Sequence, residues 1–261
     1  IINEMVSSTL GGGLHKNTIS MIIAAEIGIN HNGDIDLCHE LIRQASINGA
    51  DLVKFQLYEP KILFEDEPKL IPEGERCQFS YDEFKRVLDW CNEESIEPFF
   101  SVFDETRLEW TEKHDCKRYK IASRSVKKTP DFCKVICDLG KPTYVALGME
   151  SLENAKEIMG NYNNVKYLFC KSLYPAQYQD YANQPVDYTN SEYHGISDHT
   201  HGIEMSLLAI ARGASFIERH FTLSKSMDGS DHKCSITPEE LKELCLIGKN
   251  LHKVYKVCQK K

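Results

Sequence analysis

The chain has 261 residues, of which 41% are hydrophobic and 27% are charged, and its formal net charge is −8. The excess of carboxylates argues against a protein that binds the phosphate backbone of nucleic acids. No apolar run approaches the roughly 18 residues that a membrane span requires. The length suits a single α/β barrel, so we look for that pattern along the chain.

Residues 1–20 differ from the rest of the sequence, because a polar run with three consecutive glycines shows neither helical nor strand periodicity. We interpret them as a flexible extension or a segment foreign to the native chain. Residues 21–261 are assigned to one catalytic domain. The ten cysteines are scattered and no secretory signal is recognised, so we expect reduced thiols and a cytoplasmic location.

From Met21 onward, strand patterns alternate with helical patterns. The predicted strands are Ile22–Gly28, Leu52–Leu57, Pro98–Phe103, Tyr119–Ser123, Thr143–Gly148, Val165–Ser172, Tyr193–His199 and Phe216–Thr222.

Helix starts between these strands are well marked, with a capping box at Ser80–Glu83 and another at Thr237–Glu240. Strands that alternate with helices pair in parallel, because each crossover returns the chain in the same direction. Eight such units predict an α/β fold, the (β/α)₈ TIM barrel, with an open doubly wound sheet as the alternative. The long segments Glu59–Phe79 and Tyr174–Glu192 then lie on the face that carries the chemistry.

Two histidines end consecutive predicted strands, His199 on the seventh and His220 on the eighth. Glu218 lies two residues before His220, so both side chains point to one face of the strand. Two imidazoles beside a carboxylate suit a divalent metal ion. A hydrogen-bonded polar core is the alternative interpretation.

Lys54 and Lys120 each lie inside an apolar strand, where an ammonium group is costly unless it is paired or faces an anion. One interpretation is a structural ion pair with Glu26 or Glu218. The other is a binding site for a phosphate or carboxylate, because both lysines belong to strands that end at the same rim of the barrel. We favour the anion site.

Several runs together resemble the N-acetylneuraminate (sialic acid) synthase family. They are Ala25–Gly33, Val53–Gln56, Tyr119–Ser123, Leu173–Pro175, Ser197–Thr200 and Ile217–Thr222, in this order. The resemblance implies a TIM-barrel transferase that condenses phosphoenolpyruvate with an N-acyl mannosamine-type aldose. The products are a nine-carbon 3-deoxy-ulosonic acid and phosphate. It also implies Mn²⁺ or Mg²⁺ as cofactor and a homodimer.

The same resemblance implies roles for individual residues. The metal ligands are His199 and His220, and the catalytic residues are Glu26, Lys54, Lys120, Glu218 and Asp231, with Glu218 and Asp231 holding a metal-bound water. The predicted substrate contacts are Asn32, Gln56, Ser123, Tyr174, Ser197 and Asp198.

The sequence departs from the family pattern in three places. Arg124 follows Ser123 where the family usually has glycine, and Ala146 and Leu147 replace two hydroxyl residues. We also expect the antifreeze-like C-terminal domain of the family to be absent, or to come from a separate protein. These departures leave open a different aldose acceptor, including a phosphorylated one, a metal-dependent hydrolase, and a non-catalytic barrel subunit of a full-length homologue.

Overall fold

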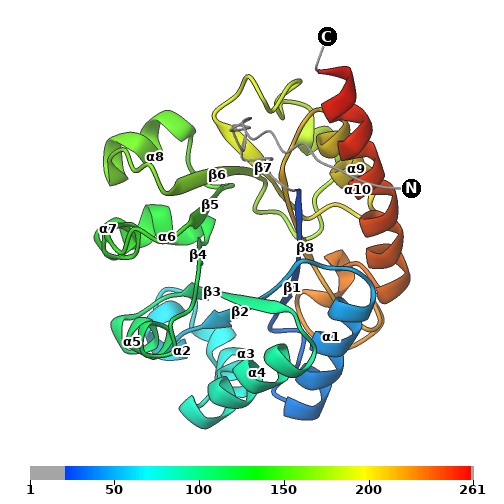
Figure 1. The fold of residues 1–261 in the computed structure, drawn as a ribbon. Helices are drawn as coiled ribbons and strands as arrows, with labels where there is room; N and C mark the ends of the chain where they lie inside the picture. The colour runs from blue at the N-terminus through cyan, green and yellow to red at the C-terminus, as the bar shows by residue number, and fades with distance from the viewer. Residues whose placement is uncertain (1–20, 260–261) are drawn as a thin grey trace, which may run out of the picture.

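The computed structural model describes residues 21–259, so the interpretation of residues 1–20 lies outside the described part of the chain. Eight parallel strands form a closed barrel in the order β1 to β8, as Figure 1 shows. The strands are β1 (Ile22–Gly28), β2 (Leu52–Leu57), β3 (Glu97–Val102), β4 (Tyr119–Ile121), β5 (Thr143–Leu147), β6 (Val165–Cys170), β7 (Tyr193–Asp198) and β8 (Phe216–His220). The predicted TIM barrel is confirmed, and the open sheet is wrong because β1 pairs with β8.

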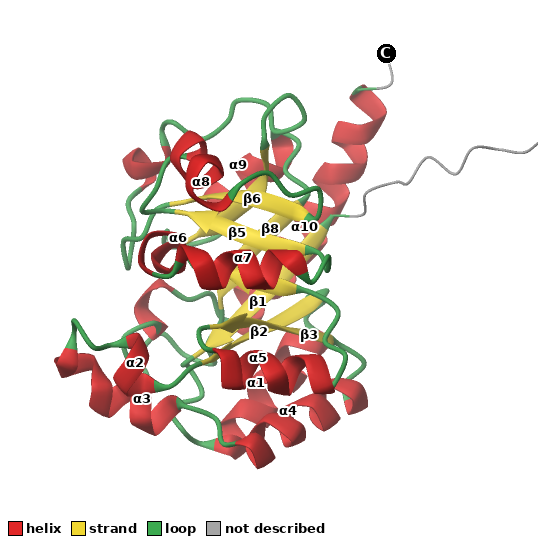
Figure 2. Cartoon of the chain, turned by 90° about the vertical axis from the view of Figure 1, so that its left-hand side faces the viewer, coloured by secondary structure: helices red, strands yellow, loops and turns green. Residues whose placement is uncertain are grey.

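Helices enclose the strands, as the side view in Figure 2 shows. The α-helices are α1 (Ile35–Ile47), α2 (Pro60–Leu63), α3 (Ile71–Cys77), α4 (Tyr81–Glu93), α5 (Glu105–Lys113), α6 (Ser123–Lys128), α7 (Pro130–Asp138), α8 (Leu152–Met159), α9 (Glu204–Ala211) and α10 (Pro238–Cys258). Three short 3₁₀ turns are η1 (Pro68–Leu70), η2 (Tyr178–Tyr181) and η3 (His232–Cys234). In residues 21–259, no helix combines the length and the apolar character needed to cross a membrane.

Both predicted capping boxes are present, at the start of α4 and of α10. In each, a hydroxyl oxygen accepts from a backbone N–H three residues later, and the glutamate there accepts from the capping residue, which satisfies two free helix-end donors. The long segment Glu59–Phe79 after β2 shows no regular pattern in the sequence, yet it contains α2, η1 and α3. All ten cysteines are free thiols.

The barrel interior is layered along the strands. An apolar layer at the amino ends consists of Ala24, Leu52, Phe99, Tyr144, Leu168 and Phe216. Because side chains alternate with a period of two, the next inward residues lie two positions later and about 7 Å higher. They include Glu26, Lys54 and Glu218, all buried. The buried charged side chains of the barrel interior therefore lie directly above an apolar layer.

A close approach between two strands of the barrel explains one glycine. A Cβ atom on Gly195 of β7 would lie 1.7 Å from the carbonyl oxygen of Phe216 on β8. Neither atom belongs to a flexible side chain, so the strands themselves would have to separate. The strands joined here are the two that end in His199 and His220.

We expect Gly195→Ala to lower the free energy of unfolding by about 3 kcal/mol, because backbone atoms would have to move. Urea denaturation measures this change. Gly140→Ala is the control, because Gly140 has φ +71 and nothing within 4 Å of a built Cβ. That variant is expected to lose only about 1 kcal/mol, from backbone strain. Equal losses in the two variants would contradict the proposed clash.

Candidate functional site

A cavity of about 120 Å³ opens at the carboxyl ends of the strands, and we call it the inner cavity. Nine of the predicted site residues line it: Lys54, Gln56, Ser123, Tyr174, Ser197, His199, Glu218, His220 and Asp231. Ser101, Phe103, Ala122, Ala146 and Cys170 also line it and were not predicted to be functional. Their position along the strands could have indicated them, because Ser101, Ala146 and Cys170 each lie two residues after a member of the apolar layer.

His199 and His220 come together on one wall of the inner cavity, with ring centroids 5.3 Å apart. The Nδ1 atom of His199 lies 2.6 Å from the carbonyl oxygen of Lys171. A carbonyl only accepts, so Nδ1 carries the proton and the neutral ring keeps its Nε2 lone pair. Burial lowers the pKa of His199 to about 4 and also lowers the pKa of His220 well below its usual value. Both rings are therefore neutral and able to act as ligands.

Asp231 adds a carboxylate beside this pair of rings. Its Oδ2 atom lies 3.5 Å from Nδ1 of His220, and that nitrogen is buried without a hydrogen-bond partner. Burial raises the pKa of Asp231 to about 6. Among the described residues, no group of three or more histidine, cysteine or acidic side chains lies close enough together to hold a metal ion by itself. Two neutral imidazoles, one of them with an unpartnered nitrogen, and a nearby carboxylate nevertheless fit a divalent cation that keeps open coordination positions.

Below and beside the histidines lie four buried charged residues, Glu26, Lys54, Lys120 and Glu218, which we call the charged layer. Lys54 forms an ion pair with Glu26 and lies 3.7 Å from Oε2 of Glu218. Lys120 lies 3.1 Å from Oε1 of the same glutamate. The two ammonium groups thus share the carboxylate of Glu218, and Lys54 also pairs with Glu26.

The ion pairs set the protonation states within the charged layer. Burial alone would raise the pKa of Glu218, but Lys120 and Lys54 hold it at about 2. Ser197 assists by donating a 2.8 Å hydrogen bond to Oε1 of Glu218. Burial, the largest effect, lowers the pKa of Lys54 to about 7. Glu218 is therefore a carboxylate at neutral pH.

The two lysines differ in their access to the inner cavity. Lys54 lines it, whereas Lys120 and Glu26 are not among its lining residues. The ion pairs that formed one of the two interpretations of these lysines are thus present in the structure. Of the two lysines, Lys54 is the one that combines an ion pair with a position on the cavity wall.

A second cavity of about 340 Å³, the outer cavity, shares Gln56, Ser123 and Tyr174 with the inner one. Ser123 begins α6, donates to the carbonyl oxygen of Ala146 at 3.1 Å and accepts from the Gly148 amide at 2.8 Å. These bonds tie the ends of β4 and β5 together beside the cavity.

Arg124, one of the departures from the family pattern, lines the outer cavity. Its Nη2 atom donates to the carbonyl oxygen of Leu63 at 2.9 Å and to Glu67 at 3.1 Å, and its guanidinium lies over the ring of Phe64. The arginine therefore holds the segment of α2 and η1 against the barrel mouth.

Two of the predicted substrate contacts lie elsewhere. Asp198 is fully buried and is not among the residues that line either cavity, because it alternates with the inward-facing Ser197 and His199. Asn32 donates to the carbonyl oxygen of Asp228 at 2.9 Å and also does not line either cavity. Both residues connect protein segments, and their role as substrate contacts stays a prediction.

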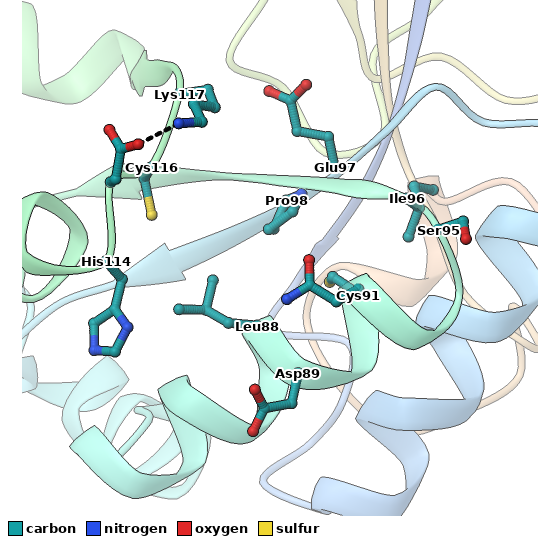
Figure 3. A pocket seen from close by; sticks show the side chains of 12 residues that line it. Leu88, Asp89, Cys91, Ser95, Ile96, Glu97, Pro98, His114, Cys116 and Lys117 are labelled. Atoms are coloured by element: carbon teal, nitrogen blue, oxygen red, sulfur yellow. Dashed lines mark hydrogen bonds and ion pairs between the residues drawn. The ribbon is translucent and has the colours of Figure 1, made fainter.

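A larger cavity of about 460 Å³ lies at the opposite end of the strands. Figure 3 shows that residues before and at the start of β3 and residues before β4 line it, among them Cys91, Glu97 and His114. The carboxyl ends of parallel strands carry the chemistry of this fold, and this cavity lies at their amino ends. Its size alone does not make it the functional site.

Comparison with known proteins finds similarities that cover most of the chain. Residues 41–260 match the model of the NeuB family. The chain is 32% identical over 248 residues to N,N'-diacetyllegionaminic acid synthase of Campylobacter jejuni, covering 86% of this chain and 74% of that protein. It is 34% identical over 261 residues to N-acetylneuraminate-9-phosphate synthase of Mus musculus, covering 89% and 69%. The structure is similar to that of N-acetylneuraminic acid synthetase from Leptospira borgpetersenii, solved with citrate, with a TM-score of 0.83, 28% identity and coverage of 90% and 85%.

Proposed function

Since the chain belongs to the NeuB family, we propose that it is a metal-dependent synthase that condenses phosphoenolpyruvate with an N-acyl mannosamine-type aldose. The product is a sialic-acid-like 3-deoxy-nonulosonic acid, released with phosphate. One observation supports this proposal above the others: Lys54 and the imidazoles of His199 and His220 face the same inner cavity. Phosphoenolpyruvate is an anion, which an ammonium group can bind. The aldose aldehyde requires a metal cation, which the nitrogens of two imidazoles can bind.

Phosphoenolpyruvate carries a phosphate and a carboxylate, so it needs donors on the cavity wall. Lys54 supplies an ammonium group, and Ser123 and Ser197 supply hydroxyl groups at the ends of β4 and β7. Lys120 lies beneath the wall and holds Glu218. We propose that it acts on the substrate by electrostatic attraction across this short distance.

His199 and His220 would hold Mn²⁺ or Mg²⁺, with Asp231 beside them. When bound, the cation supplies Lewis-acid polarisation of the aldose aldehyde. The protein side chains do the rest of the positioning. The ring of Tyr174 lies against that of His199, with centroids 4.3 Å apart and planes tilted by 35°. Tyr174 lines both cavities, so it would contact the sugar.

The condensation joins C3 of phosphoenolpyruvate to the aldehyde carbon, so that the aldehyde oxygen takes up a proton and positive character develops at C2. Water then adds at C2 and releases a proton, and phosphate leaves as its bond from oxygen to C2 breaks and the ketone forms. A carboxylate near C2 stabilises that charge. Glu218 is the carboxylate of the charged layer that reaches the cavity wall. Glu26 receives a 3.1 Å hydrogen bond from Gln56 and pairs with Lys54, so we propose that it orients these two groups toward the substrate.

A phosphorylated aldose is the second candidate acceptor, because Arg124 and Lys128 both line the outer cavity. Each already has an acidic partner, Glu67 for Arg124 and Asp66 for Lys128. Exposed ion pairs of this kind contribute only about 1 kcal/mol or less, so an incoming phosphate could replace them. A homodimer, a cytoplasmic location and a separate protein that supplies a C-terminal domain remain predictions.

Phosphate release tests the proposal. We expect release from phosphoenolpyruvate only with an N-acyl mannosamine-type aldose and Mn²⁺ or Mg²⁺ present, and its loss on treatment with a chelator. The aldose and its phosphate ester are compared at equal concentration to separate the two acceptors. Turnover without phosphoenolpyruvate would favour a hydrolase. No metal-dependent release with any aldose would favour the non-catalytic subunit and overturn the proposal.

A further inference from the structure

Asp198 and Arg219 form a fully buried ion pair between the two strands that carry the histidines. Their Cα atoms are register partners on β7 and β8, one position after the register pair Ser197 and Glu218. Oδ2 of Asp198 lies 2.5 Å from Nη1 of Arg219, and neither side chain is exposed. Side chains alternate along a strand, so this pair lies on the outer side of the barrel wall whose inner side faces the cavity.

Each member of the Asp198–Arg219 pair also bonds to the loops beyond the strands. Oδ1 of Asp198 accepts from the backbone N–H and the hydroxyl of Thr200, at 2.9 and 2.8 Å, and Oδ2 accepts from Ser206 on α9 at 2.6 Å. Nη2 of Arg219 donates to the carbonyl oxygens of Thr200 at 2.6 Å and Cys234 at 3.4 Å. The pair thus connects β7, β8, α9 and the segment after β8.

The groups tied by these bonds adjoin the metal-binding candidates. Thr200 follows His199, Arg219 precedes His220, and Cys234 contacts the carbonyl oxygen of Asp231 through its thiol at 3.2 Å. A shift of Thr200, Arg219 or Cys234 would therefore shift a neighbouring side chain on the wall of the inner cavity. A buried ion pair contributes little to stability beyond what an apolar pair of the same volume gives. Stability alone therefore does not account for charged side chains at this place.

We propose that the Asp198–Arg219 pair positions His199, His220 and Asp231, and thereby sets the affinity of the site for a divalent cation without contacting it. The inference rests on the proposed metal-dependent function. Groups that orient metal ligands typically change metal affinity about 10- to 100-fold when they are replaced.

The test measures Mn²⁺ affinity and thermal unfolding separately. Asp198→Asn keeps an acceptor for Thr200 but removes the charge opposite Arg219, and we expect its Mn²⁺ dissociation constant to rise at least about tenfold. The double variant Asp198→Leu with Arg219→Met replaces the charges by an apolar pair. It is expected to unfold closer to the wild-type temperature than Asp198→Asn, yet to bind Mn²⁺ as weakly.

Glu97→Gln is the matched control. It breaks a cross-strand pair with Arg118, which Glu97 contacts at 2.5 and 3.0 Å at the amino ends of β3 and β4. Its Mn²⁺ affinity is expected to equal that of the wild type. Wild-type Mn²⁺ affinity in the double variant would overturn the inference and leave the proposed function standing. A wild-type protein that binds no Mn²⁺ would overturn both. If Asp198→Asn does not fold, the double variant decides.

Discussion

Replacing His199 with alanine is expected to reduce metal-dependent phosphate release by about a thousandfold and to abolish measurable Mn²⁺ binding. The variant leaves one imidazole, His220, beside Asp231. A single imidazole with one carboxylate retains little affinity for a divalent cation. Metal polarisation of a carbonyl is worth several kcal/mol, and each 1.36 kcal/mol corresponds to a tenfold change in rate. Electron paramagnetic resonance of Mn²⁺ and a phosphate-release assay measure the two effects.

His194→Gln is the control for this prediction, because His194 lies on the same strand β7 but near its amino end. Its removal is expected to leave Mn²⁺ binding and turnover within a factor of about three, well under 1 kcal/mol. If His199→Ala kept more than a tenth of the wild-type metal-dependent rate, His199 would not be a metal ligand. If both variants lost activity equally, the effect would come from β7 rather than from the imidazole.

Replacing Lys54 with methionine is expected to lower kcat/KM for phosphoenolpyruvate by about 10- to 150-fold. Lys54 is the buried ammonium group on the inner cavity wall. A hydrogen bond to a charged group contributes about 1.5–3 kcal/mol, which corresponds to this loss. The same variant leaves Glu26 buried without its ammonium partner, so the free energy of unfolding is expected to fall by about 3–5 kcal/mol.

A second substitution separates the two roles of Lys54. Lys54→Met combined with Glu26→Gln removes the unpaired buried carboxylate, so we expect the free energy of unfolding to recover while phosphoenolpyruvate binding does not. Recovery of both would mean that Lys54 is a structural ion-pair partner only. Lys249→Met serves as control, because Lys249 pairs with Asp51 at 2.7 Å near the amino end of β2 and its loss should cost about 1 kcal/mol or less.

The barrel could be predicted from the sequence because its strands carry a strong local signal. β1 and β2 have the predicted bounds, and the other predicted strands overlap the observed ones. The errors concentrate at carboxyl ends, where six predicted strands run beyond the observed ends by one or two residues. Ala122, for example, was predicted in a strand but is the residue that precedes α6. The residues at these positions are still apolar although the backbone has already left the strand. The apolar pattern of the sequence therefore does not show where the strand ends.

The sequence predicted well which residues lie at the ends of strands, and less well in which direction their side chains point. Nine predicted residues line the inner cavity. The period of two places Asp198 on the opposite face from Ser197 and His199, so the strand pattern itself indicated that its side chain points away from the inner cavity. Whether Lys120 reaches the cavity wall or lies beneath it depends on the tilt of β4 in the closed barrel. That tilt is a property of the whole sheet and has no local signal.

The apolar layer at the amino ends of the strands has an electrostatic consequence. Its aromatic and aliphatic side chains exclude water from one side of Lys54, Lys120, Glu26 and Glu218. Solvent screening of these charges therefore comes mainly from the inner cavity, and low-dielectric walls focus field lines toward the side where water is present. The electrostatic potential of these four side chains is therefore strongest at the mouth of the inner cavity. An approaching ion experiences this potential before it contacts the side chains.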